Sequence, residues 1–549
     1  MDRLKKVRAL GFNAIQYYIP WNFHELEEGK YKFDEQHNFT EFSRIANSLG
    51  LYTLLRVGPY ICGEWENGGL PWWLLNKGEM KQRSSDQRFT QEVEKWFNVL
   101  LPIVKPMLRE NNGPVLMVQI ENEYGSYDAC DRTYTVWLRD LTRKHLGNNV
   151  VLYTTDGGSE GYLKCGAIPD VYPTVDFGTS SEQGIKNAFD AQRKYLPQGK
   201  GPLVNSEFYP GWLLLWGQKS QDLPSGRAIV DSAKLMFNMG ANINFYMIHG
   251  GTNFGFWNGA EVNAPCVTSY DYGAPMSEAG DVTRNYVAIR NWIKSIPNWP
   301  NAPISIPSNS TKRAYGTLRL KHVDNLETVS SGKSCIQSEH PQSFEQIDHP
   351  LGYVMYYTRV PECGKNLTIP NLKDFGYVYL DKIYQGTFVN RLDNVTVRSI
   401  RLNTCPKNKM LFIMVENQGR QTYETINDHK GILSSVYLDG KELTNWTHCP
   451  MELPLDINKY QTVTNNNAPA GDHGVYFGEM EVDEIADTFI DTTAWGKGVV
   501  IVNGHNLGRY WSSLGPQMTL YIPAPLLVKG SNSVLVIELE GANHDCHDG

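Results

Sequence analysis

Two short acidic segments each follow a run of apolar, β-branched residues. Residues 119–125 read Gln-Ile-Glu-Asn-Glu-Tyr-Gly, and residues 205–209 read Asn-Ser-Glu-Phe-Tyr. Two carboxylates at strand ends suit hydrolysis of a glycosidic bond, in which one carboxyl protonates the leaving oxygen and the other attacks the anomeric carbon or activates water. Glu123 and Glu207 are therefore a candidate catalytic pair. The alternative is that each glutamate only ends a strand in solvent, where Glu is common.

The elements that must position this pair follow a βα rhythm. Seven apolar, β-rich runs predict strands at residues 14–19, 52–57, 115–120, 151–155, 175–177, 202–205 and 242–248. Helical patterns alternate with them, for example at residues 34–49, 88–109 and 134–145. This alternation predicts a parallel sheet of the eight-fold barrel type, in which chemistry lies at the carboxyl ends of the strands. Both candidate carboxylates fall at such ends.

After residue 300 the rhythm changes to short strands separated by turn signals, at residues 376–380, 409–416, 499–502 and 532–538. This pattern is typical of β-sandwich domains. A stretch rich in Pro, Asn and Ser at residues 300–311 indicates a linker. We expect a barrel over residues 1–298, a linker over 299–315 and two β-sandwiches over 316–448 and 449–549.

Composition and motifs exclude several classes of protein. A net charge of −8 and a pI near 5.9 argue against a nucleic-acid partner. The sequence contains no run of ~18 apolar residues, the length needed to span a membrane. There is no G-x-G-x-x-G after a strand, no P-loop, no H-E-x-x-H and no C-x-x-C in the chain. We therefore predict no cofactor and no metal.

Further segments carry a family resemblance together with the two acidic ones. They read Ala-Ile-Gln-Tyr-Tyr-Ile-Pro-Trp-Asn-Phe-His-Glu at 14–25, Arg-Val-Gly-Pro-Tyr-Ile-Cys-Gly-Glu-Trp-Glu-Asn-Gly-Gly-Leu-Pro-Trp at 56–72, His-Gly-Gly-Thr-Asn-Phe at 249–254 and Thr-Ser-Tyr-Asp-Tyr-Gly-Ala-Pro at 268–275. In order and spacing the chain closely resembles the family 35 glycoside hydrolases, β-galactosidases that include the animal lysosomal acid enzyme. The resemblance implies a TIM barrel followed by two jelly-roll, galactose-binding-like domains.

The resemblance also implies roles for single residues. Glu123 matches the acid/base, and Glu207 matches the nucleophile of a retaining mechanism, whose carboxyls stand ~5–5.5 Å apart. The positions that match substrate-binding residues are Tyr18, Gly63, Glu64, Asn122, Tyr209, Trp212, Tyr246 and Tyr272. Tyr209 and Tyr246 are expected to donate to the nucleophile. Glu121 is expected to point the same way as Glu123 by strand alternation, and to be an interior or supporting carboxylate.

The number of the strand that precedes each candidate carboxylate is one lower in this chain than in the family. Its relatives place the acid/base at the end of the fourth strand and the nucleophile at the end of the seventh, whereas Glu123 and Glu207 follow the third and sixth predicted strands. The resemblance thus implies that the first barrel strand is absent from the chain as given. It also implies that Cys546 lacks its partner near the carboxyl terminus. Gly63 stands where the animal lysosomal enzyme has Ala, which leaves fine specificity open.

The resemblance implies a disulfide between Cys130 and Cys165 and a lysosomal or secreted location. N-glycosylation occurs on proteins that enter the secretory pathway, and five N-x-S/T sequons, at Asn38, Asn309, Asn366, Asn394 and Asn445, agree with such a location. Residues 1–10 are a basic amphipathic segment without the apolar core of a signal peptide.

The favoured interpretation is an exo-acting β-galactosidase that removes terminal β-galactose from glycoconjugates by double displacement. The alternative is a catalytically inactive, truncated homologue or a glycan-binding protein. The substrate partner in both cases is a carbohydrate. The activity of the chain as given and the formation of a homo-oligomer are left open.

Overall fold

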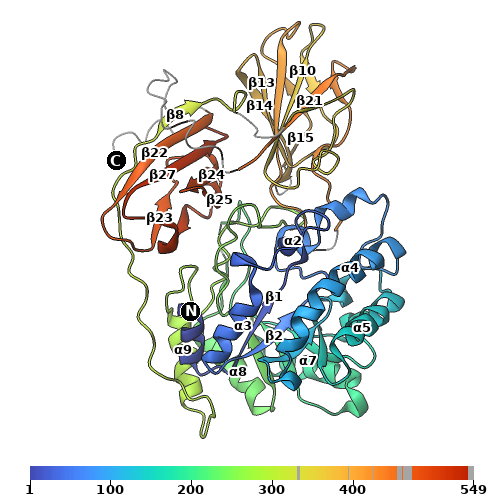
Figure 1. The fold of residues 1–549 in the computed structure, drawn as a ribbon, viewed down its shortest axis with the longest axis vertical. Helices are drawn as coiled ribbons and strands as arrows, with labels where there is room; N and C mark the ends of the chain where they lie inside the picture. The colour runs from blue at the N-terminus through green and yellow to red at the C-terminus, as the bar shows by residue number, and fades with distance from the viewer. Residues whose placement is uncertain are drawn as a thin grey trace.

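The computed structural model describes residues 1–219, 221–329, 334–392, 395–423, 426–453, 455, 460 and 473–541. The chain forms a barrel with helices around it and, above the barrel in Figure 1, two regions of antiparallel sheet. The predicted combination of an α/β barrel with all-β domains is confirmed. Two residues of the sequence analysis, Asn394 and Cys546, lie outside the described residues.

The barrel sheet contains seven parallel strands that pair in chain order. They are β1 (Ala14–Tyr18), β2 (Tyr52–Arg56), β3 (Val115–Gln119), β4 (Val151–Gly157), β5 (Tyr172–Asp176), β6 (Val204–Phe208) and β7 (Asn242–Phe245). Each coincides with one of the seven predicted strands. β5 begins earlier than predicted, because the proline at its second position masks a strand in the sequence. β6 extends through Glu207, which lies inside the strand rather than after it.

Helices cover the outside of this sheet. They are α1 (Asp2–Leu10), α3 (Phe39–Ser48), α4 (Gln87–Val104), α5 (Arg132–Leu146), α6 (Glu160–Gly166), α7 (Glu182–Tyr195), α8 (Gly226–Asn238) and α9 (Arg284–Lys294), whereas the short α2 (Trp21–His24) lies beyond the carboxyl end of β1. Several begin at a side chain that accepts a hydrogen bond from the first turn; Asn38, for example, accepts from the Glu41 amide at 3.0 Å. Each long helix buries one apolar face against the strands, which fixes the strand ends that carry the acidic segments.

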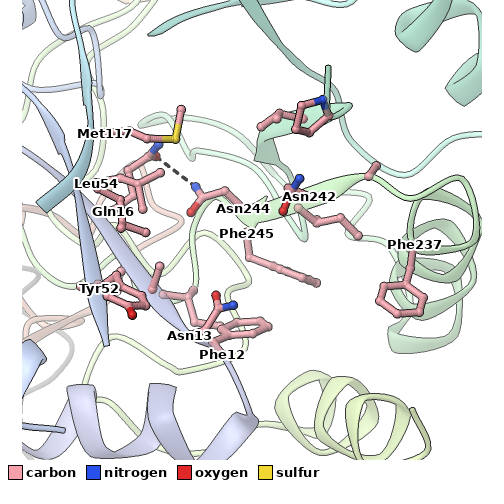
Figure 2. A pocket seen from close by; sticks show the side chains of 18 of the residues that line it. Phe12, Asn13, Gln16, Tyr52, Leu54, Met117, Phe237, Asn242, Asn244 and Phe245 are labelled. Carbon is pink, nitrogen blue, oxygen red and sulfur yellow. Dashed lines mark hydrogen bonds between the residues drawn. The ribbon is translucent and has the colours of Figure 1, made fainter. Parts of the chain in front are cut away.

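The barrel is open between its first and last strands. β1 and β7 are the edges of the sheet, and no backbone hydrogen bond joins them in the described residues. All five residues of β1 are only partly buried, whereas four of the five residues of β6 are fully buried. A cavity of about 900 Å³ borders this gap; it is lined by both edges, by residues of the other five strands and by α8 and α9. Figure 2 shows the bridging hydrogen bond from the Asn244 amide to Gln16, 3.0 Å long.

The first all-β region has a seven-stranded sheet in the order β15-β14-β13-β17-β10-β21-β9. Its strands are β9 (Ile336–Ser338), β10 (Tyr353–Arg359), β13 (Phe375–Leu380), β14 (Ile383–Leu392), β15 (Val395–Val397), β17 (Met410–Glu416) and β21 (Trp446–Met451). Smaller sheets pack on it, formed by β11 (Asn366–Thr368), β12 (Leu372–Lys373), β16 (Ser399–Arg401), β18 (Gly431–Ile432), β19 (Val436–Leu438) and β20 (Lys441–Leu443).

The second all-β region has a five-stranded sheet in the order β25-β24-β27-β22-β8 and a β23-β26 pair. Its strands are β8 (Lys321–Asp324), β22 (Gly474–Val482), β23 (Thr488–Asp491), β24 (Lys497–Val502), β25 (His505–Trp511), β26 (Thr519–Ile522) and β27 (Gly530–Glu538). β8 therefore lies in this sheet, although the predicted boundaries placed its residues in the first sandwich. β21 likewise runs past the predicted boundary at 448. A strand's pairing partner is a long-range property that local patterning does not reveal.

The first all-β region also contacts the barrel through buried polar side chains. The buried Arg420 guanidinium pairs with Glu66 of a barrel loop at 2.6 Å and with Glu345 of its own region at 2.5 Å. The Tyr60 hydroxyl donates to the Thr422 carbonyl, and the Thr422 hydroxyl donates to Glu261 at 3.2 Å. These contacts fix residues 417–423 against the barrel loops beside the strand ends.

Candidate active site

Glu207 projects from β6 into a buried, charged environment. The side chain is 4 % exposed and forms an ion pair with Arg56, which lies at the carboxyl end of β2 and is 1 % exposed. The Tyr209 hydroxyl lies 3.2 Å from Glu207 Oε2. The Arg56 guanidinium also lies over the Tyr18 ring, 4.1 Å from its centre. The ion pair between Arg56 and Glu207 favours a negatively charged carboxylate, which is the form that a nucleophile needs.

Glu123 lies in the turn after β3 in a different environment. The Asn122 amide donates to Glu123 Oε2 at 3.1 Å, and the Asn122 carbonyl oxygen accepts from Arg56. Burial, and next the charge of Glu207, raise the pKa of Glu123 to about 7. Glu207 is thus paired with a cation, whereas Glu123 retains its proton in mildly acidic solution. Two carboxyls in such different environments are the arrangement that acid and nucleophile roles require.

The aromatic residues among the predicted site positions pack together on one side of the candidate site. Tyr18, Tyr209, Tyr246 and Tyr272 belong to a single apolar cluster, and Trp212 packs on it with its ring 5.1 Å from that of Tyr209. Trp212 is 51 % exposed, so it lies at the mouth of the site. The Tyr18 hydroxyl donates to the Tyr246 hydroxyl at 2.9 Å. Exposed and half-buried rings of this kind present apolar faces with polar edges, which suits one face of a sugar ring.

Gly63 and Glu64 complete the predicted set on a loop that follows β2. Gly63 has a φ of +64°, and a Cβ atom there would lie 3.2 Å from the Tyr18 ring. Because glycine has no Cβ atom, it avoids this close contact with the Tyr18 ring. Glu64 accepts a hydrogen bond from Tyr270, and burial together with the Glu261 charge raises the pKa of Glu64 to about 8. Glu64 is a buried carboxyl that can bond a ligand hydroxyl.

Two expectations about orientation differ from the structure. Glu121 forms an ion pair with Arg83 at 2.7 Å and accepts from Tyr134 of α5 at 2.8 Å, so it supports the site from outside. Strand alternation fails here because β3 ends at Gln119, and Glu121 and Glu123 both adopt positive φ. Tyr246, expected beside the nucleophile carboxylate, instead accepts from Tyr18 and lies 5.7 Å from the Arg56 guanidinium.

The sequence analysis missed three residues that the structure brings to the site. Arg56 opens the quoted 56–72 segment, and a charged residue at an inward strand end calls for a buried partner. Asp176 ends β5 and contacts Tyr209 at 2.9 Å. Tyr423 comes from the first all-β region; burial raises the pKa of its phenol, and a hydrogen bond to Ser126 offsets part of this rise. No local signal could have found Tyr423, because it is about 300 residues away from Glu123 in sequence.

The loop that carries Glu123 is held from two sides. Cys130 forms a disulfide with Cys165 of α6, with 5.1 Å between the Cα atoms, as the family resemblance implied. The Gly125 amide donates to Asp156 of β4 at 2.8 Å. Two more disulfides, Cys335–Cys449 and Cys363–Cys405, stabilise the first all-β region. The acidic segment is therefore rigidly attached to the barrel.

Comparison with family models gives three matches in chain order. Residues 1–296 match "Glycosyl hydrolases family 35". Residues 341–452 match "Beta-galactosidase, first all-beta domain", and residues 474–532 match "Beta-galactosidase, galactose-binding domain". The three matches follow the barrel and the two all-β regions.

Curated relatives match along nearly the whole chain. A beta-galactosidase of Homo sapiens is 43 % identical over 98 % of this chain and 82 % of its own length. A beta-galactosidase of Mus musculus is 42 % identical over 100 % and 87 %, and beta-galactosidase 17 of Arabidopsis thaliana is 39 % identical over 98 % and 82 %. Among solved structures, an exo-beta-1,4-mannosidase from an Opitutaceae bacterium is 14 % identical with a TM-score of 0.39 over 56 % of each chain.

Proposed function

The chain belongs to glycosyl hydrolases family 35, and from this premise we propose that it is a retaining exo-β-galactosidase acting on terminal β-linked galactose. One observation carries the proposal. Two carboxyls, the buried Glu207 and the partly buried Glu123, share a site in which Arg56 pairs with the first and the pKa of the second is raised to about 7.

In the first step Glu207 attacks the anomeric carbon as the bond from that carbon to the leaving oxygen breaks. Glu123 delivers its proton to the leaving oxygen, and a covalent glycosyl–Glu207 ester forms. In the second step Glu123, now ionised, takes a proton from water while the water oxygen attacks the anomeric carbon. The ester bond breaks, Glu207 is ionised again, and galactose leaves with retained configuration.

The charges around the two carboxyls support the nucleophile role of Glu207 and the acid/base role of Glu123. Arg56 stabilises the ionised nucleophile and, through the Asn122 carbonyl oxygen, fixes the amide that contacts Glu123. In our proposal Asn122 also bonds the sugar 2-hydroxyl, where a hydrogen bond strengthens in the transition state. A pKa of about 7 keeps Glu123 protonated in an acidic compartment.

The sugar-binding assignment rests on groups that converge beside the pair. In our proposal Glu64 and Tyr272 bond galactose hydroxyls, Tyr18 closes the pocket from β1, and Trp212 packs on the sugar at the mouth. A site built to bond one hydroxyl leaves a buried polar group unpaired when that hydroxyl is inverted. We therefore expect β-glucosides to be poor substrates.

An oxidising route to a lysosomal or extracellular location is part of the proposal. Three disulfides lie within the described residues, and disulfides persist in such compartments. The sequon asparagines Asn38, Asn309, Asn366 and Asn445 are all at least partly exposed, so a glycan can be attached without disturbing the core. In the part of the chain that the structure describes, no helix has the length and apolar character needed to cross a membrane.

A fluorinated galactoside that forms a slowly hydrolysed ester tests the function directly. The wild-type chain should be labelled on Glu207, as peptide mass spectrometry would show, and Glu207→Gln should neither turn over nor label. Glu123→Gln should slow alkyl galactosides by about 10²–10⁴-fold and activated aryl galactosides far less, because only the former need protonation. Galactose binding by a wild-type chain with no turnover and no labelling would favour the non-catalytic, glycan-binding alternative.

A further inference from the structure

A third carboxyl, Asp176, lies beside the catalytic pair and is not used in the mechanism above. Asp176 ends β5 and is aligned with Glu207 in the parallel pairing of β5 with β6. Its side chain is 7 % exposed. Asp176 Oδ1 lies 2.9 Å from the Tyr209 hydroxyl, and Oδ2 is buried with no hydrogen-bond partner in the described residues.

The Tyr209 hydroxyl contacts two carboxyls at once. It lies 2.9 Å from Asp176 Oδ1 and 3.2 Å from Glu207 Oε2. A phenol has one proton and donates one hydrogen bond. The second contact is a hydrogen bond only if that carboxyl carries a proton of its own and donates to the phenol oxygen. One of the two carboxyls is therefore protonated whenever both contacts are satisfied.

The surroundings decide which carboxyl holds this proton. Glu207 pairs with the Arg56 guanidinium, whereas the ionisable groups that face Asp176 are acidic: Asp156 on β4, Glu123 after β3, Glu207 on β6 and Tyr209 after β6. A second ionised carboxylate here would repel Glu207 across a nearly buried contact, where solvent screens charge little. Burial, followed by the charges of Glu123 and Glu207, raises the pKa of Asp176 well above its usual range.

We propose that Asp176 is a positioning residue that acts as a neutral acid: its carboxyl O–H donates to Tyr209 and thereby directs the single Tyr209 proton onto Glu207. No proton is transferred in this arrangement; only the direction of two hydrogen bonds is set. The inference rests on the proposed nucleophile role of Glu207. When Asp176 ionises, the Tyr209 proton turns toward Asp176, and Glu207 loses a donor that stabilises its negative charge as the ester breaks.

Asparagine and leucine at position 176 separate this role from a purely structural one. An asparagine amide can still donate to Tyr209 but cannot ionise, whereas a leucine side chain cannot donate at all. Asp176→Asn should keep kcat for deglycosylation within about threefold of the wild type at pH 5, and Asp176→Leu should lower it about tenfold. Asp176→Leu combined with Tyr209→Phe should be no slower than Tyr209→Phe alone, because without the Tyr209 hydroxyl the residue at position 176 has no hydrogen bond through which to act on Glu207.

The pH profile gives a readout that packing alone would not change. Ionisation of Glu123 is removed by working in the Glu123→Gln variant with an activated aryl galactoside. Azide, an anion that needs no base, attacks the anomeric carbon in place of water in the second step, so the ester bond to Glu207 breaks and galactosyl azide leaves. The remaining alkaline fall in kcat should disappear on adding Asp176→Asn. The matched control is Asp156→Asn, a buried neighbour outside this hydrogen-bond chain, which should leave that fall in place. An alkaline fall that persists in the Asp176→Asn background would overturn the proposal.

An infrared measurement keeps this test separate from that of the function itself. A protonated carboxyl has a C=O stretch distinct from that of a carboxylate, and in the Glu123→Gln background one such band should vanish at neutral pH on adding Asp176→Asn. Loss of turnover in the wild type would sink the β-galactosidase proposal while leaving this band to be observed. Absence of the band would sink the proposal for Asp176 even in a fully active enzyme.

Discussion

The two sides of the barrel are built differently. The strands that carry Arg56, Asp176 and Glu207 each pair with neighbours on both sides. Their polar side chains are buried, with Arg56 paired to Glu207 and Asp176 hydrogen-bonded to Tyr209. On the side between β1 and β7, the two edges pair with no further strand within the described residues, the residues of β1 are partly exposed, and an apolar cavity lies beside them. Tyr18 and Tyr246 come from these edges and meet in one 2.9 Å hydrogen bond. Bond cleavage is therefore assigned to the paired side, and part of sugar binding to the open side.

The largest effect should follow from breaking the paired side at Arg56. Arg56→Met leaves Glu207 buried without its cation, so kcat/KM should fall by about 10²–10³-fold and stability by about 3–5 kcal/mol. Arg83→Met is the matched control, because it breaks a comparable buried ion pair, with Glu121. Steady-state kinetics and urea unfolding measure both variants. Equal rate losses in the two would mean that Arg56 acts through stability alone.

A polar substitution on each side measures the difference in packing. Val118 on β3 is fully buried, whereas Ile15 on β1 is only partly buried beside the cavity. Val118→Asn should cost about 3 kcal/mol of unfolding free energy, and Ile15→Asn about 1 kcal/mol or less. Denaturant midpoints with unchanged slopes would establish the ranking. A larger loss at Ile15 would show that the open side is packed as firmly as the other.

The raised pKa of Glu123 should make stability depend on pH. The pKa of Glu123 is raised from its ordinary 4.5 to about 7 in the folded state. Its contribution is therefore complete below pH 4.5 and is lost as pH rises through about 7, an effect of up to about 3 kcal/mol. Unfolding free energies of the wild type and Glu123→Gln, measured across this range, should change relative to each other in that direction. A wild-type stability that rises across this range relative to Glu123→Gln would contradict the direction of the shift.

The smallest effect is expected where the two edges meet. Tyr18→Phe removes the hydroxyl that donates to Tyr246, which should cost about 1 kcal/mol and raise KM for galactosides a few-fold with little change in kcat. Thermal unfolding and initial rates measure the two changes. A fall in kcat as large as that of Arg56→Met would place Tyr18 in the catalytic machinery and remove the contrast between the sides.

Local patterning predicted the strands well, because a buried parallel strand is a short apolar run whose period and flanks are visible in one sequence. It also predicted that Glu123 and Glu207 lie at the same end of the barrel. It failed where the answer depends on pairing in space. The expectation that Glu121 points the same way as Glu123 assumed a strand that continues past Gln119, although the alternative of a supporting carboxylate agrees with its ion pair to Arg83. The assignment of residues 321–324 to the first sandwich assumed that neighbours in sequence share a sheet. The partner of Arg56 is 151 residues away, beyond any local signal.

The Arg420–Glu66 ion pair has a consequence for how such a chain can change over evolutionary time. Glu66 lies two residues after Glu64, and Arg420, which fixes it, belongs to another region of the chain. A recombination event that exchanged the barrel without the all-β region would leave an uncompensated buried charge next to the sugar pocket. Exchange at the apparent domain boundary is thus selected against. The barrel and the first all-β region should be inherited together, and natural chimaeras with crossovers between them should be rare.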